Sequence, residues 1–314
     1  MKIVFMGTPP FAATVLERLI DEGHQVVLVV SQPDSRIGRK KELVMTPVKQ
    51  VAIKHRIPTF QPTRIKKDHQ AVIDVNPDLI ITAAYGQIIP QPLLDAPQLG
   101  CINVHASLLP KYRGGAPIHQ AIIDGESETG VTIMYMDLTM DTGDIITQAR
   151  IPITDDDDVG TLFEKLSHVG SDLLLETLPA IQGGTNPRIP QLEEDATYAY
   201  IIKREDEWVD WKRSARAVFN QIRGLNPWPT AYTKVKIPGM EIFVKAFVSK
   251  ELEATSTLEP GTIVNASGEG IDVVCGDGKL LRVLELQLAG KRRMPIKDLL
   301  NGDHPFKVGT KLGD

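Results

Sequence analysis

The 314-residue chain contains only two cysteines and no hydrophobic run long enough to cross a membrane. Cys101 and Cys275 lie far apart and neither has a CxxC neighbour, which argues against a disulfide framework and a zinc site. The seven histidines also lack the spacing of metal ligands, so we expect no metal site. No signal peptide precedes the first apolar run at residues 3–6, so we expect a cytoplasmic protein, and nothing in the sequence demands more than a monomer.

Two features typical of nucleotide- or nucleic-acid-binding proteins are also missing. The first strand-to-helix turn reads Gly7-Thr8-Pro9-Pro10, with prolines where dinucleotide-binding folds carry the middle of G-x-G-x-x-G, and no GKS or GKT sequence follows. This excludes the dinucleotide fingerprint. The formal net charge of -5 argues against a wholly basic nucleic-acid coat, but it permits a local basic patch.

Apolar runs and amphipathic segments alternate through the first half of the chain, which predicts an α/β fold with a Rossmann-like, doubly wound, mostly parallel sheet. The predicted strands are 3–6, 26–30, 59–60, 78–84, 101–105 and 130–136, and the predicted helices are 11–21, 48–54, 70–75 and 159–178. Further on, a helix at 214–223 precedes short strands at 231–236, 241–248, 261–265, 271–275 and 279–287. These indicate a small OB-like β-barrel. We therefore predict a catalytic domain at 1–184, a linker at 185–203 and a barrel domain at 204–314.

An amide and an imidazole stand two residues apart at the end of the buried strand predicted at 101–105. Asn103 and His105 therefore point to the same side of that strand and can converge on one small substrate group. The Pro- and Gly-rich residues that follow predict a shaped loop, and in an open α/β sheet such a strand end is where chemistry takes place. A single histidine at a strand end is nonetheless more often structural than catalytic.

The sequence Asp141-Thr142-Gly143-Asp144 makes a catalytic role for His105 more plausible than a structural one. This turn can bring Asp141 beside His105, although a separation of 36 residues does not prove the contact. If the contact forms, Asn103 offers an N–H donor to a carbonyl oxygen that becomes negative during attack. His105 can then transfer a proton near neutrality, while Asp141 orients the imidazole. The set suits acyl transfer without a protein nucleophile, and no G-x-S-x-G or Cys–His motif competes with it.

Three motifs resemble those of the folate-dependent formyltransferases: Asn103-x-His105, Ser107-Leu108-Leu109-Pro110 and Asp141-Thr142-Gly143-Asp144. The resemblance covers nearly the whole chain, from Gly7-Thr8-Pro9 and the basic loop at 33–49 to Asn226-Pro227-Trp228-Pro229 and residues 287–294. The last two segments are similar to the methionyl-tRNA formyltransferases rather than to shorter members. Gly115 and Met140 stand where the family pattern has Ala and Leu, and neither change affects the proton chemistry.

The resemblance implies that 10-formyltetrahydrofolate is the formyl donor and that the α-amino group of methionyl-initiator tRNA is the acceptor, for translation initiation. Asn103, His105 and Asp141 would be catalytic. The residues that would bind folate are Ser107, Leu108, Leu109 and Pro110, with Tyr85, Gly86, Gln87 and Ile88 as a wall of the pterin pocket. For the last four, an ordinary turn is an equally good interpretation.

Two basic groups could attract the phosphates of tRNA. The first is Arg36, Arg39, Lys40 and Lys41, and the second is Lys291, Arg292 and Arg293 on the predicted barrel, which Lys234, Lys236 and Lys245 could extend. On charge alone, a solvated loop explains the first group better than a binding loop does; with the resemblance, we expect it to contact the acceptor end of tRNA. Because aromatic residues make up only 5% of the chain, contact with the RNA backbone is more plausible than stacked bases.

Three alternatives stay open at this point. The chain could be a folate-dependent formyltransferase acting on a small amine, such as glycinamide ribonucleotide or an amino sugar, although a small acceptor needs neither the basic loop nor the barrel. It could be a non-catalytic RNA-binding protein, although RNA binding alone does not require Asn103, His105 and Asp141 together. It could also hydrolyse formyl-folate, with water in place of the amine.

Overall fold

The computed structural model describes residues 1–38, 41–237 and 239–313. The chain forms two compact units. The N-terminal unit contains Met1–Pro117, Glu128–Pro152 and Phe163–Tyr200, and the C-terminal unit contains Ile118–Ser127, Ile153–Leu162 and the residues from Ile201 onward. Among the described residues, no helix is long and apolar enough to span a membrane.

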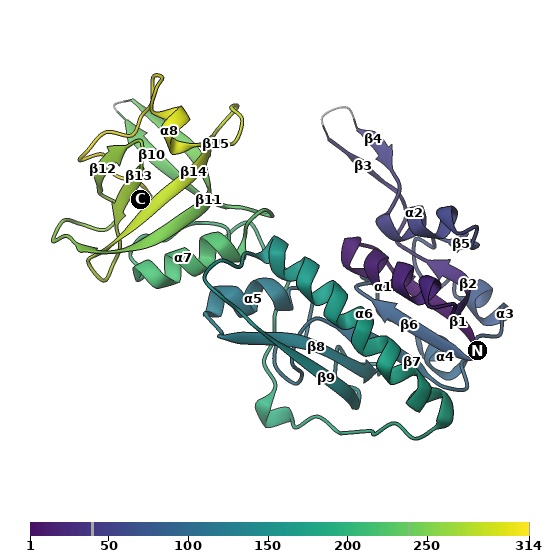
Figure 1. Ribbon diagram of the computed structural model, residues 1–314. Helices are drawn as coiled ribbons and strands as arrows, with labels where there is room; N and C mark the ends of the chain where they lie inside the picture. The colour runs from purple at the N-terminus through teal and green to yellow at the C-terminus, as the bar shows by residue number, and fades with distance from the viewer. Residues whose placement is uncertain (39–40, 238, 314) are drawn as a thin grey trace. The chain divides into compact units, whose positions relative to one another are not determined.

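A seven-stranded sheet of order β5-β2-β1-β6-β7-β8-β9 forms the centre of the N-terminal unit (Figure 1). Its strands are β1 (Lys2–Gly7), β2 (Gln25–Val30), β5 (Thr59–Phe60), β6 (Leu79–Ala83), β7 (Cys101–His105), β8 (Glu128–Tyr135) and β9 (Ile145–Pro152). Five strands of this sheet pair in parallel, namely β1, β2, β5, β6 and β7, whereas β8 is antiparallel to both β7 and β9. The prediction of a mostly parallel α/β sheet is confirmed.

The helices of the N-terminal unit are α1 (Pro10–Asp21), α2 (Pro47–Lys54), α3 (Gln70–Asp74), α4 (Gln91–Asp95) and most of α6 (Val159–Gly183), whereas all of α5 (Pro117–Asp124) after its first residue belongs to the C-terminal unit. Apolar residues of α1 recur at helical spacing and are buried, as are all five residues of β6. The sequence predicted α1, α2, α3 and α6, but not the short helices α4 and α5. It also did not predict strand β9.

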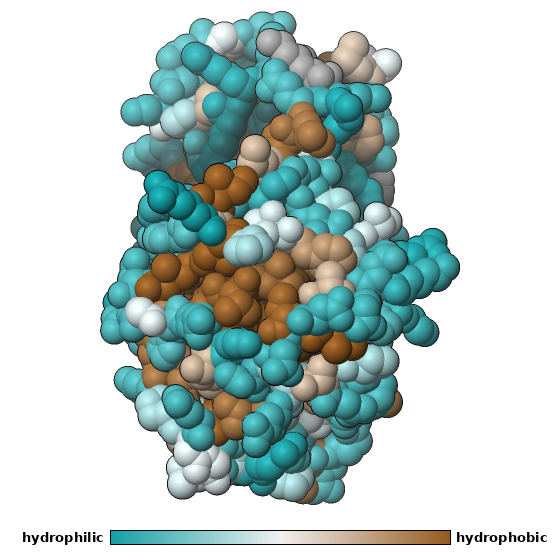
Figure 2. Space-filling model, turned by 90° about the vertical axis from the view of Figure 1, so that its right-hand side faces the viewer, coloured by the Kyte–Doolittle hydropathy of each residue, from teal (hydrophilic) through white to brown (hydrophobic). Residues whose placement is uncertain are grey.

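A two-stranded hairpin, β3 (Ser35–Ile37) and β4 (Glu42–Val44), forms a small sheet of its own where the sequence indicated a basic loop. Figure 2 shows one face of the molecule, on which hydrophobic side chains gather in a patch among hydrophilic ones. The hairpin strand β4 and the residue after it contribute to the exposed apolar surface of the protein: Leu43 is 64% exposed and Met45 is 46% exposed.

The C-terminal unit is a six-stranded antiparallel sheet of order β10-β11-β14-β13-β12, with β15 paired to β14. Its elements are α7 (Ala215–Gly224), β10 (Ala231–Ile237), β11 (Met240–Thr255), β12 (Ile263–Ser267), β13 (Gly270–Val274), β14 (Lys279–Leu288), β15 (Met294–Pro295) and α8 (Ile296–Leu299). Single bridges join Leu312 to Val235 and Lys311 to Thr262, so the end of the chain connects the two edge regions of the sheet. This closure makes the small β-barrel that the sequence predicted.

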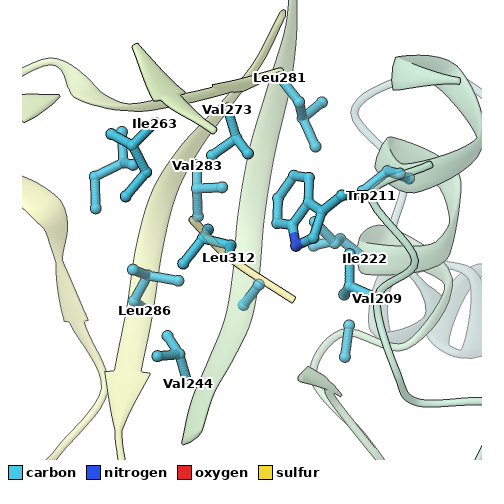
Figure 3. Packing of buried hydrophobic residues seen from close by; sticks show 14 of the residues in the cluster. Val209, Trp211, Ile222, Val244, Ile263, Val273, Leu281, Val283, Leu286 and Leu312 are labelled. Atoms are coloured by element: carbon cyan, nitrogen blue, oxygen red, sulfur yellow. The ribbon is translucent and has the colours of Figure 1, made fainter. Parts of the chain in front are cut away.

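The core of the barrel surrounds Trp211, whose side chain faces Val273 and Leu281 (Figure 3). The indole N–H donates to the hydroxyl of Thr233 at 3.1 Å, so the only polar atom of this buried ring has a partner.

Residues 186–199, which we call the strap, fall within the predicted linker but lie along the N-terminal unit. Ile189 exchanges two backbone hydrogen bonds with Ile145, at 2.8 and 2.9 Å. Ala199 donates its N–H to the carbonyl of Arg113 at 2.7 Å. A short 3₁₀ turn at Glu193–Asp195 separates these two attachments. The strap therefore belongs to the fold of the N-terminal unit, although it has no regular strand pattern.

Candidate active site

Strand β7 delivers Asn103 and His105 to the carboxyl edge of the sheet, between β6 and β8. His105 is 5% exposed, and its Nε2 lies 3.0 Å from the carbonyl oxygen of Tyr112. Because a carbonyl oxygen only accepts, Nε2 carries a hydrogen and Nδ1 is the nitrogen free to exchange a proton. Nδ1 lies 3.7 Å from Oδ1 of Asp141, so the structure brings these two residues together.

The Asp141 carboxylate is held from its other side as well. Its Oδ2 accepts the backbone N–H of Gly114 at 2.8 Å, which aims Oδ1 toward the imidazole. The Asp141 backbone is left-handed, with φ +56°, a conformation that side chains rarely adopt. At Gly143 a Cβ atom would lie 2.0 Å from the carbonyl oxygen of Tyr135, so only glycine fits there. The loop is therefore closely fitted around the carboxylate.

The amide of Asn103 has a fixed orientation because its Oδ1 accepts a hydrogen bond from the buried hydroxyl of Thr82 on β6, at 2.8 Å. The same hydroxyl lies 3.1 Å from both the Ile102 carbonyl oxygen and the Met136 sulfur, but it has one hydrogen and the Asn103 oxygen is nearest. With its oxygen engaged, Asn103 has its Nδ2 hydrogens to offer to a substrate oxygen.

The segment Ser107–Pro110 is locked against β8 and β9. Thr132 donates its hydroxyl to the Ser107 carbonyl at 2.7 Å and accepts the Leu109 N–H at 3.1 Å. Gln148 donates to the Leu109 carbonyl at 2.8 Å. The Ser107 side chain is fully buried and donates to the Lys111 carbonyl at 2.7 Å. Folate contacts by Ser107, Leu108, Leu109 and Pro110 stay a prediction; the segment itself is held in place by these hydrogen bonds.

The second expected folate segment follows β6, the strand next to β7. The Tyr85 ring is buried, and burial raises the pKa of its hydroxyl to about 12. The side chain of Gln87 fixes the loop after β6 by two hydrogen bonds. Its Oε1 accepts the Ile65 N–H at 2.9 Å, and its Nε2 donates to Oε1 of Gln32 at 3.1 Å. Gly86 has φ +89°, and Ile88 is 78% exposed. Of the four residues, Gly86 and Ile88 are exposed and therefore accessible to a ligand.

The first basic group falls on the β3–β4 hairpin. Arg36 and Lys41 are exposed, and the Arg36 guanidinium donates to the Lys41 carbonyl at 3.1 Å. Arg39 and Lys40 lie outside the described residues. At the base of the hairpin, Asp34 accepts from Lys49 at 2.5 Å and from Gln61 at 2.7 Å. These contacts hold the pKa of the Asp34 carboxyl below its usual range and fix the hairpin at its base.

The second basic group, Lys291, Arg292 and Arg293, is exposed between β14 and β15. Arg293 pairs with Glu285 and lies 4.2 Å above the ring of Phe247. Its positive charge is therefore partly neutralised by an acidic residue of the barrel. Lys234 pairs with Glu241 at 3.2 Å.

A different part of the barrel combines cations with aromatic rings, and sequence reasoning missed it. The Arg204 guanidinium lies 3.7 Å above the ring of Tyr232. Tyr232 packs against Trp208 and Phe243, with ring centroids 5.4 and 6.1 Å away, and Phe243 is 52% exposed. A depression of about 240 Å³ beside them is also lined by Lys245 and Gly290. The low aromatic content concealed this cluster because strand pairing, not composition, brings its rings together.

Neither cysteine offers a nucleophile. Cys101 and Cys275 are free and buried, and burial raises the pKa of both thiols to about 12. One group of possible metal ligands does occur among the described residues, on α1 and just after α2: Glu17, Asp21 and His55 place ligand atoms within 4.8 Å of one another. The Lys54 ammonium lies 2.5 Å from the Glu17 carboxylate and competes with a cation there. The expected absence of a metal site stays a prediction.

An amide, an imidazole and a carboxylate thus lie at the carboxyl edge of an α/β sheet, and neither buried cysteine is a nucleophile there. Chemically, an amide N–H can donate to a developing oxyanion, and an imidazole paired with a carboxylate can accept a proton.

Comparison with known proteins gives the family. Residues 1–178 match the formyl transferase family, and residues 201–304 match the formyl transferase C-terminal domain. The chain therefore belongs to the formyl transferase family, and the prediction of a one-carbon transferase is confirmed. It is 52% identical to a methionyl-tRNA formyltransferase of Enterococcus faecalis over 303 residues, 96% of each chain, and 50% identical to one of Staphylococcus aureus over 313 residues, 99% of each chain.

Solved structures share the fold at much lower identity. An N-formyltransferase from Helicobacter canadensis, in complex with folinic acid and dTDP-3-aminofucose, is 19% identical with a TM-score of 0.67, covering 90% of this chain and 98% of that one. HypX from Aquifex aeolicus, in complex with tetrahydrofolic acid, is 19% identical with a TM-score of 0.65, covering 96% of this chain and 47% of that one.

Proposed function

We propose that this protein transfers the formyl group of 10-formyltetrahydrofolate to the α-amino group of methionyl-initiator tRNA. The convergence of Asn103, His105 and Asp141 carries the catalytic part of the proposal, since His105 Nδ1 and Asp141 Oδ1 lie 3.7 Å apart. Identities of 50–52% over nearly the full length to methionyl-tRNA formyltransferases support the choice of acceptor over a small amine. We expect the protein to act in the cytoplasm as a monomer.

Each residue of the site has a distinct role in the transfer. Asn103 donates an Nδ2 hydrogen to the formyl oxygen as negative charge develops there during attack by the amine. His105 takes the amine proton at Nδ1, and Asp141 stabilises the resulting imidazolium by Coulomb attraction. His105 then returns a proton to N10 of the folate as the bond between N10 and the formyl carbon breaks. One C–N bond forms and one breaks, and the proton lost by the amine is gained by N10.

The two expected folate segments fit a flat, extended co-substrate. They follow β6 and β7, which are adjacent and parallel, so both segments leave the same edge of the sheet beside Asn103. Hydrogen bonds hold the backbone of Ser107–Pro110 in place, and this segment would present the half-buried Leu108 to a ring of the folate. The donor supplies an activated formyl group on N10, and these segments would hold that group still against Asn103.

Two surfaces would bind the RNA. Arg36 and Lys41 on the hairpin would meet phosphates near the acceptor end, together with Arg39 and Lys40. On the barrel, Lys291, Arg292 and Arg293 would contact the RNA backbone. The exposed Phe243 and the Arg204–Tyr232 pair add a surface on which an unpaired base could stack.

Comparison of acceptors tests the proposed function. The wild-type protein is mixed with 10-formyltetrahydrofolate and, in separate reactions, with methionyl-initiator tRNA, glycinamide ribonucleotide, an amino sugar nucleotide or buffer alone. We expect transfer to the tRNA to exceed the other reactions by orders of magnitude in kcat/KM. Faster transfer to a small amine, or release of formate at the same rate without an acceptor, would contradict the proposal.

A further inference from the structure

The side chain of Gln191, on the strap, uses both ends of its amide at the candidate active site. Its Nε2 donates two hydrogen bonds of 2.8 Å each, one to the carbonyl of Asp141 and one to the carbonyl of Gly143. Its Oε1 accepts the Nε hydrogen of Arg113 at 3.1 Å. An amide NH₂ group has two hydrogens, so both donors of Gln191 are committed to the loop that carries Asp141.

Arg113 fixes the orientation of this amide. It is 1% exposed, and besides Gln191 it pairs with Glu193 of the strap at 2.7 Å. A guanidinium only donates, so it selects the orientation in which Oε1 of Gln191 faces it and Nε2 faces the Asp141 loop. The next residue, Gly114, donates its backbone N–H to the Asp141 carboxylate at 2.8 Å. Asp141 is thus held at its carbonyl by Gln191 and at its carboxylate by the chain next to Arg113.

The two hydrogen bonds from Gln191 stabilise the left-handed backbone conformation of Asp141. A non-glycine residue at φ +56° is strained, and it persists only where its surroundings hold it. Rotation of the Asp141 peptide out of this conformation would swing the carboxylate away from His105. The two bonds from Gln191 anchor the Asp141 carbonyl and the Gly143 carbonyl, one at each end of the Thr142 segment, and so oppose that rotation.

We propose that Gln191 is a positioning residue of the formyl transfer: it holds Asp141 in the backbone conformation that places the carboxylate against His105. The inference rests on the proposed catalytic role of Asp141. Gln191 touches no reacting atom and acts only through Asp141, so its contribution should depend on the carboxylate being present.

A double-mutant cycle with Asp141 tests this dependence. Gln191→Glu keeps the length of the side chain and the oxygen that faces Arg113, but it loses both donors to the Asp141 loop. Single-turnover formyl transfer is measured at saturating 10-formyltetrahydrofolate and Met-tRNA. We expect a loss of about tenfold to 100-fold in rate, with KM for both substrates unchanged, because a displaced catalytic group slows the chemical step. In the Asp141→Asn background, the same substitution should change the rate by less than about twofold.

Leu192→Ala is the matched control, because Leu192 is the next residue of the strap and is 60% exposed. It should leave the rate unchanged. Gln191→Met, which keeps the length without the hydrogen bonds, should behave like Gln191→Glu.

The possible outcomes separate the inference from the function on which it rests. Full activity of Asp141→Asn would remove Asp141 from the mechanism and the proposed site with it. Loss with Asp141→Asn but none with Gln191→Glu would overturn the positioning role alone. An equal loss in both backgrounds, or failure of both Gln191 variants to fold, would assign Gln191 to stability and would also overturn it.

Discussion

The hydroxyl of Thr82 orients the amide of Asn103, so Thr82→Val should slow formyl transfer without harming the fold. Val has nearly the shape of Thr and favours strands, and position 82 is a buried position of β6, 2% exposed. The substitution removes the 2.8 Å bond to Asn103 Oδ1 and leaves the amide free to rotate.

The size of the effect follows from that one bond. A neutral hydrogen bond contributes about 0.5–1.5 kcal/mol, which corresponds to roughly a twofold to 13-fold loss in the rate of the chemical step. Loss of the Asn103 donor itself should cost more, about 100-fold to 1,000-fold. Thr82→Val should therefore fall well short of Asn103→Ala, and in the Asn103→Ala background it should have almost no further effect.

Single-turnover transfer at saturating substrates measures this step directly. Thr177→Val is the matched control, because Thr177 is also buried and its hydroxyl donates to the Leu173 carbonyl at 2.6 Å, within helix α6. An unchanged rate for Thr82→Val, or the same fractional loss in the Asn103→Ala background, would refute the idea that Thr82 acts by orienting Asn103.

Three further predictions concern RNA binding and stability. Replacing Arg36 and Lys41 by Ala should raise KM for Met-tRNA and flatten its dependence on salt, because phosphate contacts are lost; an unchanged salt dependence would contradict this. Phe243→Ala should weaken tRNA binding by about 1–3 kcal/mol with little change in salt dependence, as expected for loss of a stacking surface, and unchanged affinity in a binding assay would count against that surface. Burial lowers the pKa of His119 to about 4, so the unfolded chain binds this proton first as the pH falls. The free energy of unfolding should therefore drop by about 3 kcal/mol between pH 7 and pH 4 on account of His119. Denaturant titrations of His119→Gln should show a shallower pH dependence than wild type, and equal slopes would be inconsistent with a buried neutral imidazole.

The sequence predicts those helices and strands whose hydrophobic pattern can be recognised within the segment itself. β1 and β6 consist mainly of consecutive apolar residues, β7 begins with a short apolar pair and ends in alternating polar and apolar residues, and α1 has a buried stripe at helical spacing. These patterns are visible without tertiary contacts. The sequence predicts a loop where the β3–β4 hairpin lies, because two three-residue strands flank a basic turn and their pairing carries almost no periodic signal. Strand β9 was missed for a related reason: polar residues interrupt its buried positions.

The candidate site also has parts that the sequence predicts and parts that only tertiary contacts bring together. The convergence of Asn103 and His105 follows from the two-residue repeat of a strand, and it could be predicted. The distance from His105 to Asp141 could only be suggested, because it depends on the pairing of β7 with β8 and on the loop beyond β8. Gln191 could not be found at all: it stands in an aperiodic segment, and only the path of the strap brings it to Asp141.

The most direct test of the proposed mechanism is single-turnover formyl transfer from 10-formyltetrahydrofolate to Met-tRNA by wild type and His105→Ala, with tRNA binding measured in parallel. We predict rapid transfer by the wild type and a loss of about 100-fold to 10,000-fold in the variant, with tRNA affinity retained. Transfer by His105→Ala at the wild-type rate would show that the proton is carried elsewhere and would contradict the mechanism.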